Sequence, residues 1–102
     1  MLNIKKSKEN TTVVLSLGGR LDTTTAPELE KAVVNSYEGI TDLIIDMKDL
    51  DYVSSAGLRV LLAAQKTMNK QGKMTIRNVN ESVMEIFEIT GFLDILTIEG
   101  AN

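Results

Sequence analysis

Apolar and polar residues follow two different periods along this chain, and the first period met is that of strands. Residues 2–7 and 12–17 are rich in apolar and β-branched side chains, and the polar turn 8–11 separates them. Two such runs joined by a short polar turn are typical of a β-hairpin. Residues 18–19 are both glycine, and we expect them to end the second strand.

The helical period appears in three later segments. A helix is predicted from about Thr25 to a stop at Gly39, because Thr25 and Glu28 have the spacing of a capping box. Two further helices are predicted over residues 55–71 and, after an asparagine cap, over residues 80–91.

Short strand-like runs lie between and after these helices, at residues 43–47, 73–79 and 96–98. The first is almost entirely apolar, which is typical of a strand covered by helices on both faces. Residues 48–53 are expected to form a loop. The order is β-β-α-β-α-β-α-β, which predicts one α/β domain over residues 1–102, with flanking helices on a mixed, mostly parallel sheet.

Composition narrows the possible chemistry. The chain has 102 residues, no cysteine and no histidine, which removes disulfides, thiolate nucleophiles, serine–histidine–aspartate triads and the usual zinc ligands. The net charge is −3 and no basic cluster stands out, so nucleic acid is not an expected partner. We expect a protein that is not an enzyme.

The expected location follows from hydropathy. No apolar run approaches the roughly 20 residues of a membrane-spanning helix, and the N-terminus lacks the pattern of a signal peptide. We therefore expect a cytoplasmic protein with no membrane partner. We also expect a monomer when the protein is free.

The most unusual segment, residues 52–62, leads from a strand through a loop into a helix. In open α/β sheets, ligand sites collect outside the carboxyl ends of strands. A phosphate on Ser54 or Ser55 would be stabilised there by free N–H groups and by the helix dipole. Ala56 and Gly57 would leave room for a docking protein. A serine before a helix is most often only an N-cap, and the two roles are compatible.

The helix behind the serines is nearly devoid of charge. Between residues 56 and 64 its one charged residue is Arg59. Such a helix is either packed deeply in the core or exposes part of its first turn, around Leu58 and Arg59, to a partner.

Other candidate sites are weaker. Residues 18–19 match neither of the glycine-rich nucleotide motifs. Asp22 is either a loop carboxylate or a neighbour of the serines, if the two strand ends lie side by side. Asp46, Asp49 and Asp51 could hold a metal such as magnesium in a small enzyme, but acidic residues beside a helix start are also ordinary turn formers. We expect no metal.

Two motifs together carry a family resemblance. Residues 17–22, Leu-Gly-Gly-Arg-Leu-Asp, and the serine segment make the chain resemble the STAS domain of bacterial anti-sigma-factor antagonists. The central motif of that family reads Asp-Ser-Ser/Thr-Gly-Leu, and the serine two places before the glycine is the phosphoacceptor. Counting back from Gly57 gives Ser55. Ser54 stands where the family has aspartate, and because it carries a hydroxyl it is the second candidate for the phosphoacceptor. Ala56 stands where the family has the second Ser or Thr of the motif.

The resemblance implies a partner-switching cycle. The unphosphorylated domain would bind an anti-sigma factor that is also a serine kinase, phosphorylation would release it, and a PP2C-type phosphatase would reset it. ATP would belong to the kinase, so no cofactor is expected. The residues expected to contact the partner are Asp22, Ser54, Ala56, Gly57, Leu58 and Arg59. The alternative is a STAS scaffold that is never phosphorylated, which Ser54 in place of aspartate would favour.

Overall fold

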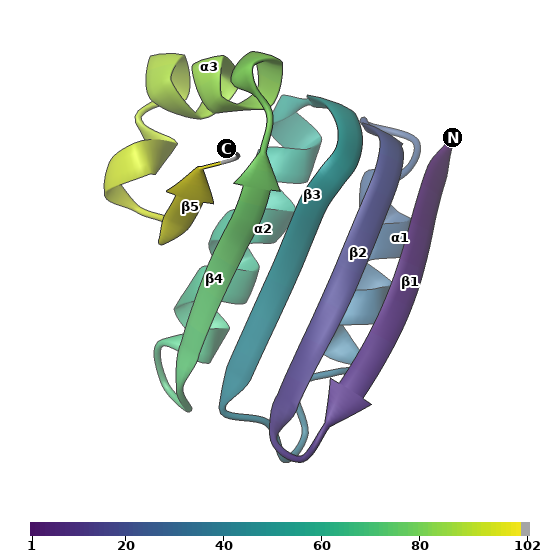
Figure 1. Cartoon of the computed structure of the whole chain (residues 1–102), viewed down its shortest axis with the longest axis vertical. Coiled ribbons are helices and arrows are strands. Elements are labelled where there is room, and N and C mark those ends of the chain that lie inside the picture. Colours follow the sequence, from purple (N-terminus) through teal and green to yellow (C-terminus); the bar gives the residue numbers. More distant parts are fainter. Residues whose placement is uncertain (101–102) are drawn as a thin grey trace.

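The computed structural model describes residues 1–100, and within them the chain folds into one mixed sheet with helices packed on it (Figure 1). The strand order is β1-β2-β3-β4-β5, with β1 antiparallel to β2 and the other pairs parallel. The strands are β1 (Leu2–Glu9), β2 (Thr12–Leu21), β3 (Asp42–Val53), β4 (Lys73–Val79) and β5 (Ile98–Gly100). The helices are α1 (Ala26–Val34), α2 (Ser55–Met68), α3 (Glu81–Thr90) and the 3₁₀ turn η1 (Phe92–Asp94). The predicted fold class and element order are confirmed.

Helices α1 and α2 lie on the same face of the sheet (Figure 1). The parallel strands follow one another in sequence order, so successive right-handed crossovers move the same way along the sheet and leave both helices on one side. The prediction that residues 43–47 are covered on both faces is therefore wrong. Leu43, Ile45 and Met47 are fully buried, whereas Ile44 and Asp46 are only half-buried on the open face.

Two irregularities in β3 explain the largest error in the predicted elements. β2 continues through its glycines to Leu21, and residues 48–53 belong to β3 rather than to a loop. The register shifts twice, from Ser16↔Asp46 to Gly18↔Asp49 and from Gly19↔Leu50 to Arg20↔Tyr52. Each shift inserts one extra residue into β3, as a β-bulge does. Leu50 and Val53 are consequently both buried although they are three residues apart, whereas a regular strand buries every second residue. The alternating pattern that predicts a strand is therefore missing from this part of the sequence.

Several element ends also differ from prediction. The last strand begins at Ile98 instead of residue 96, because Leu96 is buried in the turn that follows η1. α1 ends at Val34 and α2 at Met68, each a few residues early. The capping box does not form, since the side chain of Thr25 makes no cap bond to α1. In residues 1–100 no helix is both long and apolar enough to cross a membrane.

Candidate functional site

The site lies at the edge of the sheet where β2 and β3 end. The Ser54 N–H donates a hydrogen bond of 2.8 Å to the Leu21 carbonyl, so the two strand ends are directly joined. Asp22 follows one strand and the serines follow the other. The two strand ends thus lie side by side, as the sequence analysis required for Asp22 to be a neighbour of the serines. The start of β1 lies at the same edge, because the Arg20 N–H donates to the Met1 carbonyl at 3.1 Å.

Ser54 is the N-cap of α2. Its backbone is extended, with φ −89° and ψ 173°, and its hydroxyl oxygen accepts a hydrogen bond from the Gly57 N–H at 3.3 Å. This is the arrangement in which a side chain satisfies one of the free donors at a helix start. The oxygen of Ser54 is therefore already used by the fold.

Ser55 is in a different position, although it is the next residue. It is the first residue of α2 and is exposed. Its hydroxyl forms no hydrogen bond with the residues that the structure describes. The first turn of α2 contains no acidic residue, so no carboxylate of that turn competes for the positive end of the helix dipole. Ser55 thus presents an exposed hydroxyl, unbonded among the described residues, at the positive end of α2.

The next residues differ from expectation in what they touch. Gly57 is buried, and a Cβ atom there would lie 2.6 Å from Cγ of Leu21 and 3.2 Å from Cγ1 of Val53. The glycine therefore lets α2 approach the ends of β2 and β3 closely, rather than clearing space for a docking protein. Leu58 is 4% exposed and belongs to the core, so of the two interpretations of this helix the packed one applies to Leu58, and a partner could not reach its side chain as its place among the contact residues required.

The two remaining candidates of this helix turn lie nearer the surface. Ala56 is half-buried and Arg59 is exposed. Together with Asp22 and Ser54, they are the predicted contact residues that a partner could reach.

Asp22 is fixed in a compact loop. Its Oδ1 accepts hydrogen bonds from the Thr24 hydroxyl at 2.7 Å, the Thr24 N–H at 3.0 Å and the Thr25 N–H at 3.1 Å. The hydroxyl of Thr25 in turn donates to the Arg20 carbonyl at 2.9 Å. The bond from the Thr24 hydroxyl is the main reason that the pKa of Asp22 lies below its ordinary value. Asp22 therefore presents a fixed negative charge beside the serines.

A pair that the sequence did not single out lies next to Asp22. The guanidinium of Arg20 stacks over the ring of Tyr52, with Cζ 4.5 Å from the ring centroid. Its Nε is 3.9 Å from Oδ2 of Asp22. The two stacked residues are direct neighbours across β2 and β3 only because of the second bulge. The sequence carries no signal of that register.

The acidic residues proposed as metal ligands do not gather. In residues 1–100, no group of three or more acidic side chains could hold a metal ion. Asp46 instead accepts hydrogen bonds from the Lys48 N–H and the Asn78 amide, and it lies 3.6 Å from Nε of Arg77. Burial alone would raise the pKa of Asp46, but these donors and the arginine charge together lower it.

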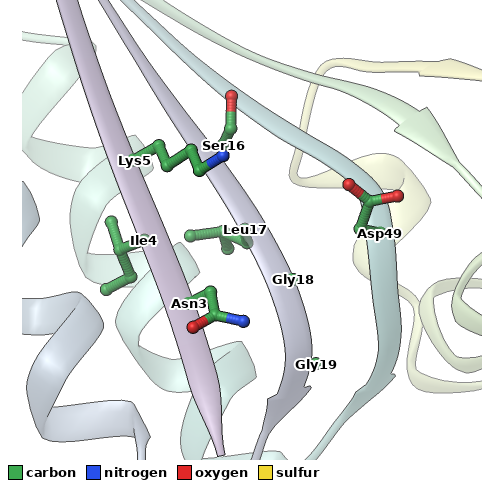
Figure 2. A pocket seen from close by; sticks show the side chains of 8 residues that line it. All are labelled: Asn3, Ile4, Lys5, Ser16, Leu17, Gly18, Gly19 and Asp49. Atoms are coloured by element: carbon green, nitrogen blue, oxygen red, sulfur yellow. The ribbon is translucent and has the colours of Figure 1, made fainter.

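A shallow hollow of about 510 Å³ lies on the open face of the sheet, away from the serines. Figure 2 shows it between β1, β2 and β3, with polar side chains at its rim. Gly18 contributes no side chain to it, and a Cβ atom there would lie 3.4 Å from Cβ of Asp49 and 3.9 Å from Cβ of Asn3. Its lining residues are Asn3, Ile4, Lys5, Ser16, Leu17, Gly18, Gly19 and Asp49.

Comparisons with known proteins agree with this architecture. The family model described as the STAS domain matches residues 3–101. The anti-sigma-B factor antagonist of Bacillus subtilis (strain 168) is 32% identical over 102 residues, which covers 99% of this chain and 94% of that protein.

Solved structures show the same fold. The unphosphorylated form of the anti-sigma factor antagonist SpoIIAA superposes with a TM-score of 0.84 at 18% identity, covering 98% of this chain and 89% of that one. The phosphorylated form of SpoIIAA from Bacillus superposes with a TM-score of 0.76 at 17% identity, covering 98% and 92%.

Proposed function

This chain belongs to the STAS domain family, and from that premise we propose that it is an anti-sigma-factor antagonist controlled by phosphorylation of Ser55. In its unphosphorylated state it binds an anti-sigma factor that is also a serine kinase, in the cytoplasm and as a monomer. The observation that supports Ser55 as the phosphorylated residue is that the two serines at the start of α2 have different structural roles. Ser54 caps the helix, whereas Ser55 is exposed with an uncommitted hydroxyl.

The reaction requires little of the domain itself. Oγ of Ser55 attacks the γ-phosphorus of ATP held by the kinase, the bond to the ADP oxygen breaks, and the serine proton passes to a base of the kinase. The domain supplies an accessible nucleophile on a rigid helix start. It contributes no cofactor and no catalytic residue. A phosphatase of the PP2C type would hydrolyse the phosphoester and restore the binding state.

Electrostatics explain why a phosphate would end the complex. It adds about −1.5 to −2 charges beside Asp22, which is already ionised at neutral pH. Free in water, the phosphate is stabilised by the start of α2. In a tight contact with the partner, the phosphate must be desolvated next to the negative charge of Asp22. This costs several kcal/mol unless the partner supplies cations. Each loss of about 1.4 kcal/mol weakens Kd tenfold.

The proposal is tested by binding to an anti-sigma factor of the ATPase-fold serine-kinase type, measured by calorimetry. Wild type and Ser55→Ala should bind alike, and Ser55→Asp should bind at least tenfold more weakly. Ser82 provides a matched control, because it is also exposed in a first helical turn, that of α3. Ser82→Asp should therefore bind as wild type does.

Phosphate transfer is measured in the same preparation, by intact mass after incubation with ATP. Ser54→Ala should accept one phosphate and Ser55→Ala none. Equal binding by Ser55→Ala and Ser55→Asp, with no phosphate on either serine, would replace this proposal by the scaffold that is never phosphorylated.

A further inference from the structure

The Arg20–Tyr52 stack places an exposed positive charge at the edge of the sheet that carries Ser55. Arg20 is the last residue but one of β2, and its side chain is 56% exposed. Tyr52 is half-buried, so its ring is held by the protein while the guanidinium lies on it. We propose that Arg20, held on Tyr52, is a specificity-determining residue that receives a carboxylate of the anti-sigma factor.

The arginine is preorganised for such a contact. Its backbone is fixed on both sides, since its N–H donates to the Met1 carbonyl and its carbonyl accepts from the Thr25 hydroxyl. The preceding Gly19 has φ +93°, and a Cβ there would overlap the Met1 carbonyl oxygen, so this path of the chain requires glycine. Stacking on Tyr52 then restricts the side chain itself. A residue ordered before binding loses less entropy on binding.

The charge of Arg20 is not consumed within the molecule. Its one ion pair among the described residues is the contact of 3.9 Å from Nε to Oδ2 of Asp22, which is too long for a hydrogen bond. The other oxygen of Asp22 is bonded by Thr24 and Thr25. The outer N–H groups of the guanidinium fork therefore remain available, and their geometry fits a carboxylate with two parallel bonds.

The position links this contact to the switch, and here the inference rests on the proposed function. Tyr52 is three residues before Ser55, at the joined ends of β2 and β3. A partner carboxylate on Arg20 would lie at the same edge as a phosphate on Ser55. The two negative groups would repel each other, so the contact that favours binding of the unphosphorylated domain also makes phosphorylation disruptive.

The experiment measures affinity for the same kinase-type anti-sigma factor, by calorimetry over a series of salt concentrations. Arg20→Met keeps the aliphatic stem and removes the charge, and it should weaken binding at least tenfold and flatten the salt dependence. Arg20→Lys should recover part of the affinity. Tyr52→Phe should bind as wild type does, because the ring alone supports the stack. The matched control is Arg77→Met, which removes a second arginine paired with a carboxylate, far from the serines on β4.

Each outcome separates the contact from the switch. If Ser55→Asp weakens binding while Arg20→Met does not, the switch stands and the role of Arg20 is refuted. If Arg20→Met weakens binding with unchanged salt dependence, Arg20 acts by packing, and the carboxylate is refuted. If wild type does not bind the anti-sigma factor at all, the proposed function and this inference fall together.

Discussion

The two adjacent serines should differ in their effect on stability, and this difference tests the assignment of their roles. Replacing Ser54 by alanine removes the oxygen that accepts from the Gly57 N–H. Loss of an N-cap costs about 0.5–2 kcal/mol, and because the donor left unpaired belongs to the buried Gly57, we expect the upper half of that range. We expect Ser54→Ala to lower the free energy of unfolding by about 1–2 kcal/mol. For a domain of this size, each 1 kcal/mol corresponds to about 4–8 °C in Tm.

Ser55→Ala is the matched comparison. Its hydroxyl is exposed and unbonded among the described residues, so the change should stay within about 0.5 kcal/mol of wild type. Ser54→Asp should also remain close to wild type, because aspartate caps a helix as well as serine does. This variant restores the residue that the STAS motif carries at this place.

The assay is urea unfolding followed by far-UV circular dichroism, with Tm from thermal scans of the same samples. The expected order of stability is wild type, Ser55→Ala and Ser54→Asp together, with Ser54→Ala clearly below them. If Ser55→Ala were as destabilised as Ser54→Ala, Ser55 would also be a structural residue. The division of roles on which the proposed switch depends would then be refuted.

Two further predictions concern packing and pH. Gly57→Ala should lower the free energy of unfolding by about 1 kcal/mol, because overpacking against Leu21 costs about 1–3 kcal/mol and the helix preference of alanine returns up to about 1 kcal/mol. Gly18→Ala is the control and should change the free energy of unfolding less, since its Cβ would meet its nearest neighbour at 3.4 Å. Equal losses for the two variants in urea unfolding would contradict the argument. Folding lowers the pKa of Asp46 from its ordinary value of 3.8, so its ionised form adds stability that is fully present above pH 3.8. This contribution is lost as the pH falls through the lower pKa of the folded state. The difference in unfolding free energy between wild type and Asp46→Asn should therefore shrink in acid, and a difference that stays constant with pH would show that its ionisation does not contribute.

The fold was largely predictable from the sequence because local signals agreed with one another. The glycine stop at Gly91, the cap at Asn80 and the apolar strand at residues 43–47 each marked an element whose type the structure confirms. The second half of β3 was not predictable, because its bulges place Leu50 and Val53 in the core at a spacing that strands do not normally have. Bulges are set by pairing with β2, which is a tertiary property.

The site was predictable only in part, for the same physical reason. The helix start and the two serines could be located from local pattern, but their different roles depend on which oxygen reaches the Gly57 N–H. The Arg20–Tyr52 stack depends on the register across β2 and β3, and no spacing along the chain encodes it. Gly57 drew attention through a motif, yet its contacts with Leu21 reveal a packing role that the motif alone does not express.

The separation of the two serines has a consequence for how such a switch can work. A phosphate on Ser54 would be attached to the oxygen that caps α2, so the cap of the modified state would have to be remade with an oxygen of the phosphate. A phosphate on Ser55 changes charge at an exposed position while the cap, the Gly57 contact and the Asp22 loop remain in place. Binding then changes without any requirement for refolding. A domain that must cycle repeatedly between two partners is better served by the second arrangement, and the geometry at the start of α2 provides it.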